Sequence, residues 1–245
     1  MVNRKEVIAR TKAHYRFSLQ ELQGLLIAIL ITALIFSFRD WGTDIFDITA
    51  GLGNLFITLL VVGFTFFFRL SCQKVYGVIE GHYAEFKLWW VGIGIAIIVA
   101  FISRGYAPLV FAGGVFTSLM IKFRLGEYRY GFSFWKNAVL ASWGIMGNLI
   151  LAIFFALGLY FFPESYWLNQ GLKLNIIMAF CSLIPLPQLD GMHIFFGSRI
   201  YYVMVWAMVI LTTVLLLSGT LAGVIIAMVL AGLLMGLYLL TSSEK

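Results

Sequence analysis

The stretch Ser182-Leu-Ile-Pro-Leu-Pro-Gln-Leu-Asp-Gly191 combines two prolines, a single carboxylate and a Leu-Asp-Gly sequence within a very apolar chain. Backbone that proline interrupts at membrane depth is tolerated only where protein or a water-filled cavity surrounds it. A carboxylate at that depth costs about 2.5–3.5 kcal/mol on insertion scales. We therefore expect Asp190 to face the interior of a helical bundle and to have a partner there. The alternative is a loop at the membrane surface that contains an aspartate.

The composition around this stretch is that of a polytopic membrane protein. Hydrophobic residues make up 62% of the chain and charged residues only 11%, whereas soluble domains carry about 25% charged residues. The net charge of +6 does not indicate nucleic-acid binding, because the basic residues gather in the N-terminal segment and a few loops, as membrane topology requires. Cys72 and Cys181 both fall in apolar segments, so we expect free thiols and no disulfide framework.

The predicted fold is an all-α helical bundle of about six to eight spans, with short interfacial strands as an option. Residues 1–20 form a basic, amphipathic cytoplasmic lead, residues 21–242 a single membrane domain, and residues 243–245 a cytoplasmic end. The acidic loop that reaches Asp47 is expected outside, which places both termini in the cytoplasm. A prokaryotic cell membrane is the expected location, and the lipid bilayer is the first expected partner.

Apolar runs and turn residues predict the individual elements. Spans are expected at 22–38, 53–76, 91–102, 138–162, 200–218 and 220–240, with a helix over 172–184 and an outside loop over 163–170. Residues 81–90 are amphipathic and interfacial, and residues 108–121 form a re-entrant segment or a short helix. The alternating aromatic stretch 128–134 is either a half-buried strand or an interfacial loop, and we favour the loop.

Two segments resemble motifs of the site-2 type of intramembrane zinc metalloproteases. That family has an Asn-Leu-x-Pro-x-x-Pro-Leu-Asp-Gly-like turn, whose aspartate is the third zinc ligand. Ser182 stands here where Asn is usual, and Gln188 where Pro is common. Gly144-Ile-Met-Gly-Asn-Leu149 resembles the family's Ala-Gly-Pro-x-x-Asn-Leu helix, with isoleucine replacing the proline, and the resemblance implies that Asn148 faces the active-site region. The residues that match the turn are Leu183, Pro185, Leu189, Asp190 and Gly191.

The family's catalytic His-Glu-x-x-His motif is absent. The three histidines are His14, His82 and His193, and no two of them are four residues apart. Some members follow the zinc motif with a lysine and, about a dozen residues later, with Gly-x-x-Ala-Glu-Phe. The chain has Gly81-His-Tyr-Ala-Glu-Phe86 with Lys74 upstream, so the resemblance, which spans roughly residues 50–200, aligns Arg69-Leu-Ser-Cys-Gln73 with the missing motif.

At those positions the resemblance implies a vestigial site. Arg69 replaces the first zinc ligand, Leu70 the general base and Gln73 the second ligand, so that Asp190 alone remains. A hydrolytic zinc site needs three protein ligands and a base that activates water, and a guanidinium stays protonated. A rearranged zinc site would have to recruit side chains from elsewhere, with Cys72 and His193 beside Asp190 as weak candidates. The side chains considered for this role are Cys72, Glu80, His82, Glu85 and His193.

A direct pairing of Arg69 with Asp190 is the sharpest structural hypothesis. Arg69 and Gln73 share a helix face because they are four residues apart, and in the family the aligned positions converge on one metal with the aspartate. A guanidinium there restores the lost positive charge, with Gln73 and Asn148 satisfying the remaining donors and acceptors. The alternative is that Arg69 and Lys74 mark the cytoplasmic end of a helix and extend toward water.

Three functions remain open from the sequence. The first is a protease-like membrane protein without catalysis that binds membrane proteins or transmembrane segments, and it needs no cofactor. The second is an active intramembrane metallopeptidase with a rearranged zinc site. The third is a transporter or channel. Retention of Asp190, the proline turn and Asn148 favours the first two, and loss of the histidines and the glutamate favours the first.

Overall fold

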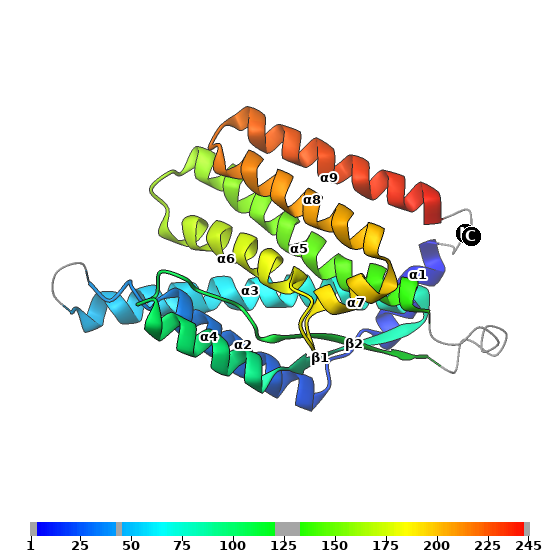
Figure 1. Ribbon diagram of the computed structural model, residues 1–245, viewed down its shortest axis with the longest axis horizontal. Coiled ribbons are helices and arrows are strands. Elements are labelled where there is room, and N and C mark those ends of the chain that lie inside the picture. The colour runs from blue at the N-terminus through cyan, green and yellow to red at the C-terminus, as the bar shows by residue number, and fades with distance from the viewer. Residues whose placement is uncertain (1–3, 43–45, 121–132, 243–245) are drawn as a thin grey trace.

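A computed structural model describes residues 4–42, 46–120 and 133–242 (Figure 1). The described residues form nine helices and a two-stranded sheet. In chain order they are α1 (Arg4–His14), α2 (Leu19–Phe36), α3 (Ile48–Glu80), β1 (His82–Leu88), α4 (Trp90–Ile102), β2 (Gly113–Leu119), α5 (Phe134–Phe161), α6 (Tyr166–Leu183), α7 (Asp190–Gly197), α8 (Arg199–Leu217) and α9 (Leu221–Ser242).

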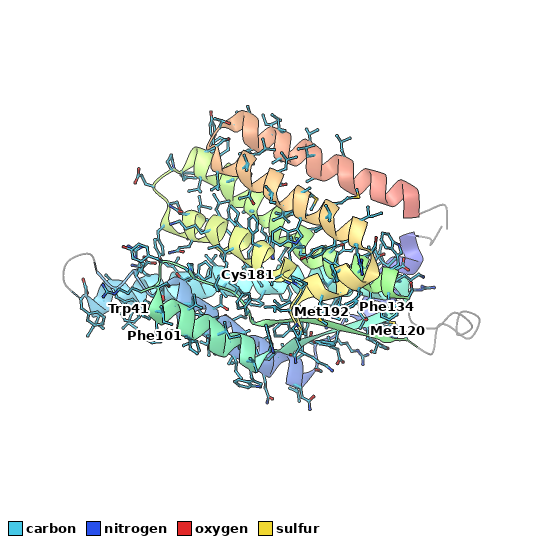
Figure 2. All side chains as sticks on the ribbon, viewed as in Figure 1. Trp41, Phe101, Met120, Phe134, Cys181 and Met192 are labelled. Atoms are coloured by element: carbon cyan, nitrogen blue, oxygen red, sulfur yellow. The ribbon has the colours of Figure 1, made fainter. Side chains whose placement is uncertain are left out.

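Four helices, α2, α3, α5 and α8, are each long and apolar enough to cross a membrane, which makes the chain an integral membrane protein. Helix α4 has 13 residues, which is about 20 Å of helix against a hydrocarbon core of about 30 Å. The total of six to eight spans stays a prediction. Helix α1 and the C-terminal end of α9 lie at the same end of the molecule (Figure 1). Trp41 and Phe101 mark the opposite end from Met120 and Phe134 (Figure 2).

Local sequence explains where the two N-terminal spans begin and end. Ser18 and Glu21 form a capping box at the start of α2, with the side chain of each accepting from the backbone N–H of the other. Asp47 caps α3 by accepting from the N–H groups of Thr49 and Ala50. The helix then runs for 33 residues and ends at Gly81, whose φ of 72° is left-handed and therefore favours glycine.

Strands β1 and β2 are short strands of the kind that the predicted fold left as an option, and β2 corrects one prediction. Residues 81–90 are amphipathic as expected, but with the period of two of a strand, since His82, Ala84 and Phe86 are buried and Tyr83, Glu85 and Lys87 exposed. The stretch predicted as a re-entrant segment or short helix contains β2 instead. A short apolar run fits either state in sequence, and antiparallel pairing with β1 decides between them. The predicted strand or loop over 128–134 lies outside the described residues, apart from its last two positions.

Other boundaries also shift. Helix α3 begins five residues before the predicted 53 and continues to Glu80. Helix α6 begins at Tyr166, so the predicted loop over 163–170 shrinks to the residues before it. The bounds of helices α2, α4, α5, α8 and α9 lie close to those of the corresponding predicted segments.

Helix α5 lies at the centre of the packing and contacts α3, α6, α7, α8 and α9. One apolar core joins the inner faces of α2 and α3 to the sheet and to parts of α5 and α6. A second core, which includes Ile145, Leu183 and Ile194, joins α5, α6, α7 and α8. The proline turn between α6 and α7 therefore lies where these two cores meet.

The register of the sheet leaves specific backbone groups facing outward from the pair of strands. Hydrogen bonds from Met120 N to Gly81 O and from Trp89 N to Ala112 O define the hydrogen-bonded pairs. Phe86 and Val115 face each other in a non-hydrogen-bonded pair, so their N–H groups point away from the partner strand. Each outward N–H then needs an acceptor outside the sheet.

A buried ion pair supplies the acceptor on the β1 side. The N–H of Phe86 donates to Glu21 Oε1 at 2.9 Å, and Glu21 Oε2 accepts from Lys74 Nζ at 2.9 Å. Lys74 Nζ also donates to the carbonyls of Ala84 and Arg16. The alternative in which Lys74 extends to water is wrong, because only 5% of the residue is exposed.

Candidate functional site

Asp190, the first residue of α7, is fully buried and has partners on both of its carboxylate oxygens. Oδ2 accepts from Arg69 Nη2 and from Gln73 Nε2, the latter at 3.1 Å. Oδ1 faces the N–H of Val115 at 3.4 Å, so this carboxylate serves the outward edge of β2 as Glu21 serves that of β1. The expectation that Asp190 faces the interior and has a partner is confirmed.

Arg69 reaches this carboxylate from the middle of α3, and the predicted pair is confirmed. The residue is 4% exposed, which contradicts the alternative that its side chain extends to the membrane surface. Its second terminal nitrogen, Nη1, donates to Ser182 Oγ at 2.7 Å, and Ser182 in turn donates to the carbonyl of Met178. Sequence comparison singled out Ser182 only as a departure from the family's asparagine, and local sequence gives no signal that it receives a guanidinium.

Gln73 lies one turn further along the same face of α3. Its Nε2 donates to Asp190 and also lies 3.3 Å from the carbonyl of Ala141 on α5. A Cβ atom added at Gly144 would lie 2.5 Å from that nitrogen, and one at Gly147 would lie 3.4 Å from the Cα of Arg69. The two glycines therefore allow α3 and α5 to approach closely at the ion pair.

Asn148 follows on α5 and is fully buried. The expectation that it satisfies donors and acceptors of the ion pair is wrong, since neither its Oδ1 nor its Nδ2 has a hydrogen-bond partner among the described residues. Gln73 Oε1 is likewise without a partner. Ser182 and Val115 fill the place that was expected for Asn148, because they approach Asp190 and Arg69 from α6 and β2.

The turn that delivers Asp190 depends on two special backbone positions. Gln188 has a φ of 67°, which proline cannot adopt because its ring fixes φ near −65°. A proline, which is common at this position in the family's turn, would not fit the backbone that Gln188 has here. At Gly191, an added Cβ would lie 2.1 Å from the carbonyl oxygen of Leu183, so only glycine fits where α7 packs on the end of α6.

Gly191→Ala is therefore expected to destabilise the protein by about 1–3 kcal/mol, because backbone must move to relieve the clash. The control is Gly53→Ala, in α3, where an added Cβ meets nothing within 4 Å and where alanine should stabilise the helix by up to about 1 kcal/mol. Equilibrium unfolding in detergent measures both changes. A Gly191→Ala protein as stable as the Gly53→Ala control would contradict the close packing.

The alternative zinc ligands do not gather around Asp190. The Nδ1 atom of His193 lies 3.1 Å from Nδ2 of Asn137, and the imidazole ring packs edge-on against Phe116. Cys72 lies on α3 facing Gly147. Glu80 pairs with Lys136 at 3.1 Å, His82 is buried and Glu85 exposed on β1. Within the described ranges, no three His, Cys, Asp or Glu side chains are grouped as a metal site requires.

The donor set at Asp190 does not fit a catalytic zinc. Of the three side chains that converge there, one is a carboxylate, one is an amide and one is a cation that has no lone pair to give. Leu70, at the position of the general base, is 1% exposed and belongs to the apolar core. The site is a buried ion pair with its own hydrogen bonds.

Fold and site together define a helical membrane protein with a buried arginine–aspartate pair at a proline turn. A protein of Methanocaldococcus jannaschii that carries the name "Putative zinc metalloprotease" is 28% identical to the chain over 181 residues, which are 72% of this chain and 84% of that protein. This likeness over most of the chain points to a metalloprotease family. No family model matches the chain, and no solved structure is significantly similar to it.

Proposed function

We propose that the chain is a site-2-protease-like membrane protein that has lost catalysis and binds membrane proteins or transmembrane segments. The observation that carries the proposal is the carboxylate of Asp190, which is buried and held by Arg69, Gln73 and the N–H of Val115. A metal ligand must offer a lone pair to the metal, and both oxygens of this carboxylate already serve protein donors. Removing the metal while keeping the acid requires another cation, and Arg69 is that cation.

The similarity to a metalloprotease supports the scaffold, and the residues at the site argue against hydrolysis. Leu70 takes no proton, so no side chain at this position can activate water. What the scaffold retains is a bundle whose helices expose long apolar faces, including Phe56, Leu60 and Phe64 on α3. In a membrane these faces contact lipid or the apolar helix of another protein. They therefore offer a surface on which a transmembrane helix can pack.

We expect purified protein in lipid nanodiscs to bind a fluorescently labelled single-span peptide and to release it intact. Energy transfer from the tryptophans of the protein to the label measures binding, and mass spectrometry of the recovered peptide detects cleavage. Cleavage that is abolished both by a chelator and by Asp190→Ala would overturn the loss of catalysis. Transfer no greater than that from an unrelated membrane protein of equal tryptophan content would overturn the binding role.

A further inference from the structure

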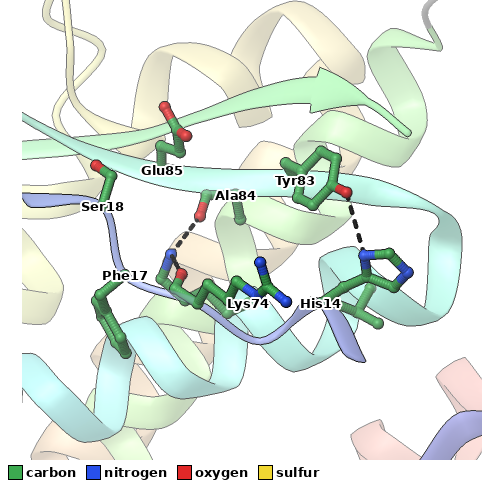
Figure 3. Close-up of a pocket in the computed structure, with 9 residues that line it drawn as sticks. His14, Phe17, Ser18, Lys74, Tyr83, Ala84 and Glu85 are labelled. Atoms are coloured by element: carbon green, nitrogen blue, oxygen red, sulfur yellow. Dashed lines mark hydrogen bonds between the residues drawn. The ribbon is translucent and has the colours of Figure 1, made fainter. Parts of the chain in front are cut away.

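A cavity of about 270 Å³ lies between the segment that joins α1 to α2, the start of β1 and the C-terminal part of α3 (Figure 3). It is away from Asp190, which is not among its lining residues. Ser18 and Glu85 lie at one end of it, and His14 and Tyr83 at the other (Figure 3). The volume is slightly below the usual range of ligand pockets, about 300–1,000 Å³, and suits a small headgroup rather than a whole ligand of drug size.

The charges that face this cavity are of both signs. Lys74 contributes no free donor, because its three N–H groups serve Glu21 and the carbonyls of Ala84 and Arg16. Arg16 and Glu85 are both exposed and line the cavity. Neither forms an ion pair with another residue in the described part of the chain, so a guanidinium and a carboxylate are available there.

An apolar strip leads away from the cavity along α2. Leu19 follows Ser18 directly and is 79% exposed, and Leu22, Leu26 and Leu30 are exposed on the same side of the helix. Because α2 is a candidate membrane span that begins at Leu19, Arg16 and Ser18 lie at the level of the lipid headgroups. The cavity, whose lining also includes the apolar side chains of Phe17 and Val78, therefore places charged groups at headgroup depth, beside a surface that acyl chains can cover.

We infer that this cavity binds the headgroup of one phospholipid with a primary ammonium group, of the phosphatidylethanolamine type. The Arg16 guanidinium and the Ser18 hydroxyl bind the phosphate, since a guanidinium matches phosphate bidentately. The Glu85 carboxylate accepts hydrogen bonds from the ammonium, and the acyl chains lie along the leucines of α2. Phosphatidylcholine fits less well, because its trimethylated ammonium has no N–H to donate.

The test measures retention of one lipid by the purified protein in detergent, using native mass spectrometry with phosphatidylethanolamine or phosphatidylcholine of identical chains. Wild-type protein should retain one phosphatidylethanolamine about tenfold more tightly than phosphatidylcholine, as the loss of a charge-assisted hydrogen bond implies. Glu85→Gln should remove this preference, and Arg16→Gln should weaken retention of both lipids. Exposed residues far from the cavity provide matched controls: Lys173→Gln and Glu164→Gln should behave as wild type.

A second arm uses soluble phosphoethanolamine and inorganic phosphate, which carry the polar groups without acyl chains. Neither should displace the retained lipid at the lipid's own concentration. Equal competition by phosphoethanolamine would overturn the lipid assignment and leave a site for a small phosphate ester. Identical retention of both lipids by wild type, Arg16→Gln and Glu85→Gln would overturn the site itself. All four substitutions are at exposed positions, so folding does not obscure the comparison.

Discussion

Arg69→Ala is expected to lower the free energy of unfolding by about 3–5 kcal/mol, because it leaves Asp190 as a buried charge without its cation. Asp190→Ala should cost a similar amount by leaving the guanidinium buried and unpaired. The double substitution should cost clearly less than the sum of the two, since it removes both charges together. Equilibrium unfolding of the four proteins in detergent gives the coupling free energy of the double-mutant cycle.

A second ion pair in the same protein provides the control for this cycle. Lys136 and Glu80 are 3.1 Å apart with side chains 37% and 24% exposed, so their coupling should be about 0–1 kcal/mol. The contrast between the two cycles compares a buried ion pair with a partly exposed one in the same protein. Additive costs at Arg69 and Asp190 would show that the contact contributes nothing to stability, and would remove the basis for treating Arg69 as the substitute for a metal.

Restoring the missing motif should create a zinc site. In the triple variant Arg69→His, Leu70→Glu, Gln73→His, the two introduced imidazoles occupy positions whose present side chains both contact Oδ2 of Asp190. Two imidazoles and a carboxylate are a ligand set that catalytic zinc uses. We expect about one zinc per chain by elemental analysis after dialysis, whereas the parent protein should retain none above background.

Two further variants separate metal binding from catalysis. Arg69→His with Gln73→His, which keeps Leu70, should bind zinc without cleaving a membrane-spanning reporter, because it lacks the general base. Adding Asp190→Ala to the triple variant should abolish stoichiometric binding, because the third ligand is lost. A triple variant that folds but retains no zinc would show that these side chains do not converge as a ligand set, and the vestigial origin of the site would be wrong.

The ion pair could be predicted from sequence because each part of the argument is local or is supplied by the resemblance. Helical periodicity places Arg69 and Gln73 on one face, and the aligned zinc ligands bring that face to Asp190. Ser182 and Val115 could not be predicted, because they meet the pair through the packing of α6 and β2, which no local pattern encodes. Asn148, which the resemblance places facing this region, was expected to satisfy part of the ion pair, but it is buried without a hydrogen-bond partner among the described residues.

The sheet, unlike the ion pair, could not be predicted from local sequence. Its strands are short, and β2 begins with two glycines, so their residues fit a strand or an irregular segment equally well. The capping box of Ser18 and Glu21 is a local signature of a helix start. The second role of Glu21, as acceptor for Phe86 N and partner of Lys74, depends on a strand more than sixty residues away.

Helix α3 holds both edges of the sheet through one rigid element. Lys74 fixes the carboxylate that accepts from Phe86 N, and Arg69 fixes the carboxylate that faces Val115 N, so a rotation or shift of α3 would loosen both at once. In hydrogen–deuterium exchange, the amides of Phe86 and Val115 should then report a single opening event. A ligand that strengthens the contact of Glu21 with the Phe86 amide would then also slow deuterium uptake at the Val115 amide, although it touches neither amide.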